Sequence, residues 1–230
     1  MIIKIMRRAI IFGGFDVNKK EYSSLYKLLK KENFNVKIEE INTASTFEQS
    51  VDNIINSINK YKPKIIIAHS LSSPLLYCVS LKNPCILKKT HIAVFGPVQN
   101  SDNIENITIP KFLQQDLCVP SIFIKIIGYS LNIFTKNNNI LKDITINKIY
   151  NIGVVTKSLQ YIKDNKQDYR KFLCNDKIFV VLSKCDKLVG YDDKIITNNF
   201  INKFILENED HCEILNDKKI IKKFKLFIRK

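Results

Sequence analysis

The sequence lacks tryptophan and has only six glycines and two methionines in its 230 residues. Its 45% hydrophobic and 26% charged residues nevertheless lie near the averages for soluble globular proteins, which excludes an intrinsically disordered chain. A chain of this length suits one large domain better than two. We therefore look for a single fold.

Arginine is scarce, although lysine and arginine together number 37 and give a formal net charge of +15. The arginines are Arg7, Arg8, Arg170 and Arg229. An excess made of lysine is what an AT-biased coding sequence produces. Specific readout of phosphates and bases would instead favour the bidentate guanidinium of arginine. We expect no nucleic-acid partner, and a basic nucleic-acid-binding protein is the less favoured alternative. The basic segment 217–229 alternates lysines with apolar residues and predicts an amphipathic helix with a solvated basic face.

Metal-ligand spacing is also lacking, since the six cysteines form no Cys-x-x-Cys pair. We expect reduced thiols, no metal and no cofactor. The charged stretch Met1–Arg8 precedes an apolar run too short for a signal peptide. The most apolar stretch, 117–134, is interrupted by proline, lysine, glycine and asparagine, so it is a poor match to the roughly 20 apolar residues of a membrane span. We expect a cytoplasmic protein with no transmembrane segment.

Short runs rich in isoleucine, valine and phenylalanine alternate with stretches of helical period. This alternation predicts an α/β fold, with a mostly parallel sheet of about six strands flanked by helices. The expected strands are 8–12, 34–38, 64–68, 90–95, 177–182 and 203–206. The expected helices are 20–31, 48–60, 71–80, 193–201 and 217–229.

The alternation stops between residues 100 and 172, where the pattern is irregular or helical. Long insertions between two sheet strands often cover a functional site. We therefore expect one domain over residues 1–230, with a sheet core at 1–99 and 173–230 and a helical cap at about 100–172. The apolar residues of the cap suit either a lipophilic substrate group or the core of the cap itself.

The segment Ala68-His69-Ser70-Leu71-Ser72 joins an expected strand to an expected helix. A serine on a sharp strand-to-helix turn projects its Oγ above the sheet, and the usual pattern there is Gly-x-Ser-x-Gly. Ala68 and Ser72 occupy the two glycine positions. The alternative is an ordinary turn with a capping serine.

This stretch resembles the α/β-hydrolase superfamily, in which a common variant has histidine before the nucleophilic serine and leucine or methionine after it. The resemblance covers nearly all of the chain outside the cap, but it begins at the third strand of the superfamily. The two usual leading strands are therefore expected to be lacking.

The resemblance implies a catalytic triad of Ser70, Asp186 and His211, in the chain order of the superfamily. Asp186 follows strand 177–182 immediately, and it is preferred for that reason over Asp192 and Asp193. His211 lies in the loop 207–213, after the last expected strand.

Only two other histidines are present. His69 is expected to point away from the reacting groups, and His91 opens a buried strand, where a structural role is expected.

The resemblance also implies an oxyanion hole of backbone amides. One donor is the amide of Leu71. The second comes from the loop Phe12-Gly13-Gly14-Phe15, with Phe15 preferred and Gly14 as the alternative. The histidine that often precedes the glycine in the superfamily is absent here.

These residues together predict a serine esterase or thioesterase that cleaves a carboxylic ester or thioester through an acyl-enzyme on Ser70. We expect a lipophilic acyl group on a small-molecule ester or thioester, which is bound to an anionic carrier if the lysine excess has a role. Because both elbow glycines are replaced, a catalytically inactive α/β-hydrolase-fold binding module is the alternative.

Overall fold

The computed structural model describes residues 6–14, 17–88, 90–97, 118–120, 149–186 and 202–229. Its main sheet has the strand order β2-β1-β3-β4-β7-β8, and every neighbouring pair is parallel. The strands are β1 (Arg7–Phe12), β2 (Phe34–Glu39), β3 (Ile65–His69), β4 (His91–Phe95), β7 (Ile178–Ser183) and β8 (Lys203–Leu206). The predicted α/β sheet of six strands is confirmed, and each predicted strand end lies within one residue of the observed end.

Apolar residues on both faces explain why the central strands form. Every residue of β3 and of β7 is buried, as expected for parallel strands covered on two sides. Successive side chains alternate between two cores: Ile66 and Val180 point to one, and Ile67 and Val181 to the other.

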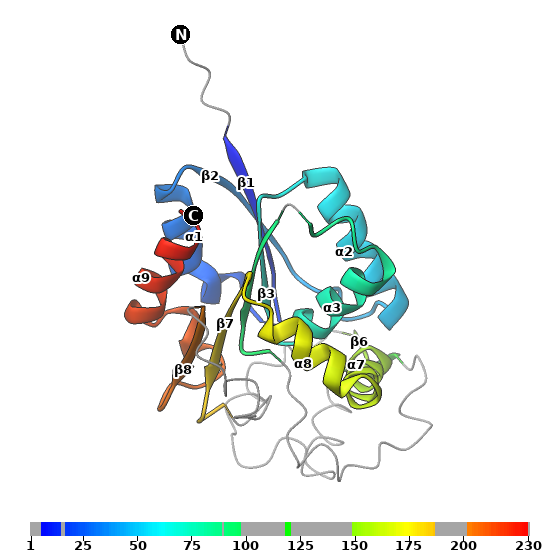
Figure 1. The fold of residues 1–230 in the computed structure, drawn as a ribbon. Coiled ribbons are helices and arrows are strands. Elements are labelled where there is room, and N and C mark those ends of the chain that lie inside the picture. Colours follow the sequence, from blue (N-terminus) through cyan, green and yellow to red (C-terminus); the bar gives the residue numbers. More distant parts are fainter. Residues whose placement is uncertain are drawn as a thin grey trace.

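Helices cover both faces of the sheet (Figure 1). The short 3-10 helix η1 (Lys19–Tyr22) leads into α1 (Ser23–Lys31), which lies on one face with α9 (Lys218–Phe227). The other face carries α2 (Phe47–Tyr61), α3 (Ser72–Lys82), α7 (Ile152–Asp164) and α8 (Lys166–Cys174). The helix expected at 193–201 lies outside the described residues.

The C-terminal helix α9 has the predicted amphipathic character. Asp217 caps its first turn, and Ile220, Phe224 and Phe227 are buried against the sheet. Lys218 and its neighbouring lysines on the opposite side are exposed. The apolar face of this helix is therefore used within the domain.

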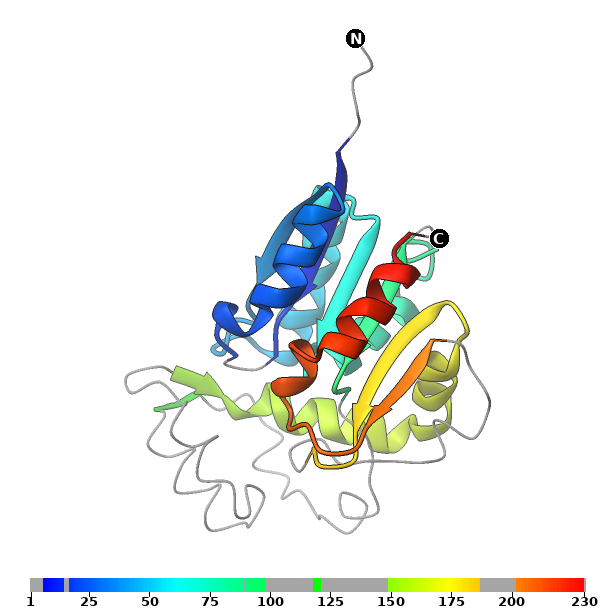
Figure 2. The same cartoon turned by 90° about the vertical axis from the view of Figure 1, so that its left-hand side faces the viewer.

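The segment expected as a helical cap contains a small antiparallel pair, β5 (Cys118–Pro120) with β6 (Ile149–Asn151), in addition to helices. Figure 2 shows β6 leading into α7, which runs beneath the sheet. Tyr169 and Leu173 of α8 are buried in the same core as the sheet, so the expected boundary at 172 falls inside a helix that covers the sheet. Residues 98–117 and 121–148 lie outside the described residues, and a cap over the site stays a prediction.

Candidate active site

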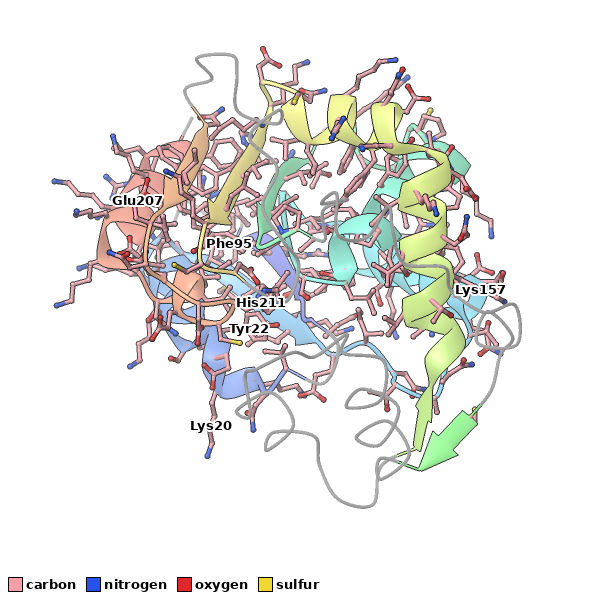
Figure 3. The ribbon with its side chains drawn as sticks, turned by 90° about the horizontal axis from the view of Figure 1, so that it is seen from below. Lys20, Tyr22, Phe95, Lys157, Glu207 and His211 are labelled. Carbon is pink, nitrogen blue, oxygen red and sulfur yellow. The ribbon has the colours of Figure 1, made fainter. Side chains whose placement is uncertain are left out.

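The predicted site residues follow strands that end at one edge of the sheet, because all six strands run in the same direction. Gly14 follows β1, Ser70 follows β3, Asp186 follows β7 and His211 follows β8. Figure 3 looks onto this edge, where His211 and Tyr22 lie among the side chains near the middle of the view.

Ser70 has a left-handed backbone conformation, with φ of 55°. Non-glycine residues rarely adopt this region, and it persists only where the surroundings enforce it. Asn33 and Lys62 also have positive φ, but both lie just after the end of a helix, where such a conformation is common. Ser70 lies instead between a strand and the helix that follows, which is the geometry of a nucleophile elbow.

The hydroxyl of Ser72 stabilises this turn from inside. Its Oγ accepts a hydrogen bond from the His69 amide at 2.7 Å. The same Oγ lies 2.9 Å from the carbonyl oxygen of Phe12 and 2.8 Å from that of His69, so its single proton is donated to one of them. Serine at this usual glycine position therefore satisfies the buried amide of His69 and places a hydroxyl within hydrogen-bond distance of the end of β1.

Asp186 and His211 form a buried pair. Oδ2 of Asp186 lies 2.7 Å from Nδ1 of His211, and each side chain is less than a tenth exposed. The carboxylate accepts, so Nδ1 carries the proton and Nε2 is left as an acceptor in the neutral ring. Nε2 is buried and has no hydrogen-bond partner among the described residues. A buried polar atom of this kind calls for an explanation, and a role as a base supplies one.

The described part of the chain contains no hydrogen bond between Ser70 Oγ and His211 Nε2. The two residues are linked instead through the segment Phe95-Gly96. The amide of Ser70 donates to the carbonyl of Phe95 at 3.0 Å, and the next residue, Gly96, lies against the His211 ring. A Cβ on Gly96 would come within 3.2 Å of Cε1 of that ring. A hydrogen bond between a nucleophilic hydroxyl and its base is often long in the absence of substrate and tightens when substrate binds.

Of the expected oxyanion donors, the amide of Leu71 makes no hydrogen bond within the described residues. The amide of Gly14 already donates to the Tyr22 hydroxyl at 2.8 Å. It is therefore engaged in this structure, although a Cβ on Gly14 would lie 3.1 Å from Cβ of Ser70. Phe15 lies outside the described residues, as do Asp192 and Asp193, the rival candidates for the acid.

Comparison with known proteins gives no match to a protein-family model and none to a curated protein. Solved structures do match. A lipase in its open form gives a TM-score of 0.65 at 13% identity, covering 97% of this chain and 90% of its own. A monoglyceride lipase from Saccharomyces cerevisiae gives 0.62 at 11%, covering 97% and 86%. Est1E from Butyrivibrio proteoclasticus gives 0.59 at 14%, covering 98% and 89%.

The chain has the α/β-hydrolase fold. The order of its six described strands and the position of the elbow after β3 both fit that fold. The two leading strands that were expected to be lacking are not among the described residues. Identities of 11–14% establish a fold and leave the reaction to be argued from the site.

His69 is the residue that sequence reasoning missed in this α/β-hydrolase fold. Its ring is completely buried and lies 4.7 Å from the His211 ring, centroid to centroid. Nδ1 lies 3.0 Å from the Tyr22 hydroxyl, and Nε2 lies 3.2 Å from the carbonyl oxygen of His211. Burial, reinforced by the neighbouring His211, lowers the pKa of His69 well below its usual value, so the ring is neutral. The expectation that His69 points away from the reacting groups is wrong, because its ring lies beside the ring of His211.

Two further observations concern the described residues as a whole. No cluster of three or more histidine, cysteine, aspartate or glutamate side chains there has the arrangement of a metal site. No described helix has the length and apolar character needed to cross a bilayer.

Proposed function

We propose that this protein is a serine hydrolase that cleaves a carboxylic ester or thioester through an acyl-enzyme on Ser70. His211 is the general base and Asp186 orients it. The amides of Leu71 and Phe15 form the oxyanion hole. We propose that residues 1–230 form a single domain, in which the cap insertion at about 100–172 covers the site.

The observation that carries this proposal is the pairing of two unusual features at one edge of the sheet. Ser70 is held in a left-handed conformation at the elbow. His211 has a buried Nε2 that finds no hydrogen-bond partner in the part of the chain that the structure describes, while its Nδ1 is bonded to Asp186. Each feature is unfavourable on its own, and together they are the parts needed for nucleophilic catalysis.

In the first half of the reaction, Ser70 Oγ attacks the carbonyl carbon while its proton passes to Nε2 of His211. Asp186 stabilises the imidazolium that forms, and the backbone amides stabilise the negative oxygen of the tetrahedral intermediate. The intermediate collapses, and the departing alcohol or thiol takes the proton from Nε2. A water molecule then repeats the sequence on the acyl-enzyme and releases the acid.

The acyl group is proposed to be lipophilic. The apolar segment 117–134 that suggests it lies almost wholly outside the described residues, and two of the solved neighbours are named as lipases. The exposed lysines of α9 are available to attract an anionic carrier, such as a phosphopantetheine-linked acyl group.

Turnover of p-nitrophenyl esters of increasing acyl length tests the proposal. We expect activity in the wild type and its loss in Ser70→Ala and His211→Gln, with thermal unfolding showing that both variants fold. Ser23→Ala, a substitution at an exposed serine of α1, is the matched control and should retain the wild-type rate.

Equal rates in Ser70→Ala and the wild type would overturn the assignment of the nucleophile. A folded protein that binds acyl compounds but turns none over would instead support the inactive binding module. Nucleic-acid binding with a steep salt dependence, without ester turnover, would support the basic binding protein.

A further inference from the structure

A continuous chain of hydrogen bonds links three of the loops at the site. The Gly14 amide, in the loop after β1, lies 2.8 Å from the hydroxyl of Tyr22. That hydroxyl lies 3.0 Å from Nδ1 of His69, at the end of β3, and Nε2 of His69 lies 3.2 Å from the carbonyl oxygen of His211. Tyr22 and His69 are 47 residues apart, and His69 and His211 are 142 apart.

Elementary donor and acceptor chemistry fixes every proton in this chain. The Gly14 amide can only donate and the His211 carbonyl can only accept, so His69 carries its proton on Nε2. The neutral ring then offers Nδ1 as an acceptor, and the Tyr22 O–H must point at it. Each of the three hydrogen bonds therefore has a defined donor and acceptor, and every proton is donated in the direction from Gly14 to His211.

The surroundings hold these side chains in place. Tyr22 and His69 are both completely buried, and their rings meet edge-on with centroids 5.7 Å apart. Gly14 packs so closely that an added Cβ would lie 3.0 Å from Nδ1 of His69. Burial raises the pKa of Tyr22 and lowers that of His69, so both remain neutral near neutral pH.

We propose that Tyr22 and His69 are positioning residues that hold the Gly13-Gly14 loop and the His211 loop in register with Ser70. This inference rests on the proposed function. His211 is then restrained twice, with its side chain bonded to Asp186 and its backbone to His69. Because the Gly14 amide donates to Tyr22, it is already engaged and is not free to bind the oxyanion in this structure.

A purely structural role for the pair would lower stability without changing catalysis by the folded protein. A positioning role instead lowers kcat, because small displacements of reacting groups slow the chemical step more than they weaken substrate binding. The two roles are therefore separated by kinetics measured well below the unfolding temperature of each variant.

The first test is Tyr22→Phe, which keeps the ring and removes both bonds of the hydroxyl. We expect kcat for a p-nitrophenyl ester to fall by roughly 10- to 100-fold with KM nearly unchanged. The rate of labelling of Ser70 by a fluorophosphonate should fall in parallel. Tyr26→Phe is the matched control, since Tyr26 is a partly exposed tyrosine of α1 outside the site.

The second test separates the two hydrogen bonds that His69 makes, one with Tyr22 and one with the His211 carbonyl. The amide nitrogen of a glutamine reaches the position of Nε2 and can still donate to the His211 carbonyl, whereas an asparagine reaches only the position of Nδ1. We expect His69→Gln to retain more kcat than His69→Asn, because it preserves the bond to the base. His91→Gln, at the opposite end of the sheet, is the control and should retain the wild-type kcat.

The outcomes separate this inference from the function on which it rests. A wild type that is not labelled at Ser70 contradicts the proposed function itself. A wild type that is labelled, together with a folded Tyr22→Phe variant of unchanged kcat and labelling rate, overturns the positioning role while the function stands. A loss of kcat confined to the Tyr22 and His69 variants supports the positioning role. Equal rates in His69→Gln and His69→Asn overturn the role assigned to the bond between His69 and the His211 carbonyl.

Discussion

Oδ2 of Asp186 lies 2.7 Å from Nδ1 of His211, although the two residues are 25 positions apart in the chain. The contact is possible because β7 and β8 are parallel neighbours whose carboxyl ends lie together. It fixes the tautomer of the imidazole and leaves Nε2 buried as an acceptor without a hydrogen-bond partner among the described residues.

Asp186→Asn tests what the carboxylate contributes. The amide can keep the shape of the loop but cannot stabilise the imidazolium or enforce the same tautomer. We expect kcat to fall by roughly 1,000- to 10,000-fold. Steady-state ester hydrolysis provides the measurement. Asp52→Asn, which removes an exposed carboxylate on α2, should be indistinguishable from the wild type, and a similar loss in both variants would count against the assignment.

Gly96→Ala tests the space beside the base. Gly96 has φ of +50°, and a Cβ there would lie 2.8 Å from Ile214 Cδ1 and 3.2 Å from the His211 ring. We expect the free energy of unfolding to fall by about 1–2 kcal/mol from the left-handed backbone alone. We also expect kcat to fall, because the imidazole must move.

Asn33→Ala is the matched control for that substitution. Asn33 also has a left-handed backbone, with φ of 63°, but it lies in the turn between α1 and β2, away from the site. It should lose a comparable amount of stability, measured by urea unfolding, and no kcat. An unchanged kcat in Gly96→Ala would show that the His211 ring does not depend on this contact.

Ser72→Gly restores the usual glycine of the elbow and removes the Ser72 hydroxyl. The buried amide of His69 then loses its acceptor, and an unsatisfied buried donor costs roughly 1–3 kcal/mol. We expect a lower free energy of unfolding by that amount, from chemical denaturation, in both Ser72→Gly and Ser72→Ala. Ser80→Ala, in the last turns of the same helix, should change it by less than about 0.5 kcal/mol. A more stable Ser72→Gly variant would mean that the hydroxyl contributes nothing.

The neutral state of His69 predicts how stability depends on pH. Its pKa is lowered in the folded protein, so the unfolded chain binds the proton more readily, and stability falls as pH falls below about 6.5. Calorimetry at about pH 7.5 and about pH 5.5 should therefore show a smaller drop in unfolding temperature for His69→Gln than for the wild type. His91, whose pKa is lowered less strongly, should contribute less. Equal drops in the wild type and His69→Gln would contradict a buried neutral His69.

The sheet could be predicted from the sequence because its strands are short apolar runs with few alternatives. Ile65–His69 and Ile178–Ser183 are buried along their whole length, and such runs fit only a sheet covered on both faces. The small pair Cys118–Pro120 and Ile149–Asn151 could not be predicted, because three residues are too few to show a period of two.

The candidate site was predictable in part. The resemblance to the α/β-hydrolases implied Ser70, Asp186 and His211, and the structure places the loops that carry them at one edge of the parallel sheet, while their catalytic roles stay a prediction. The role of His69 was not predictable, because its partners Tyr22 and His211 are distant in the sequence and a bond to a backbone carbonyl leaves no residue pattern. The bond from the Gly14 amide to Tyr22 was hidden for the same reason.

The most direct test of the central claim is the site at which a fluorophosphonate reacts, mapped by mass spectrometry of the digested protein. We expect a single adduct on Ser70, absent in Ser70→Ala and formed much more slowly in His211→Gln. No adduct on the folded wild type, or an adduct at another serine that persists in Ser70→Ala, would contradict it.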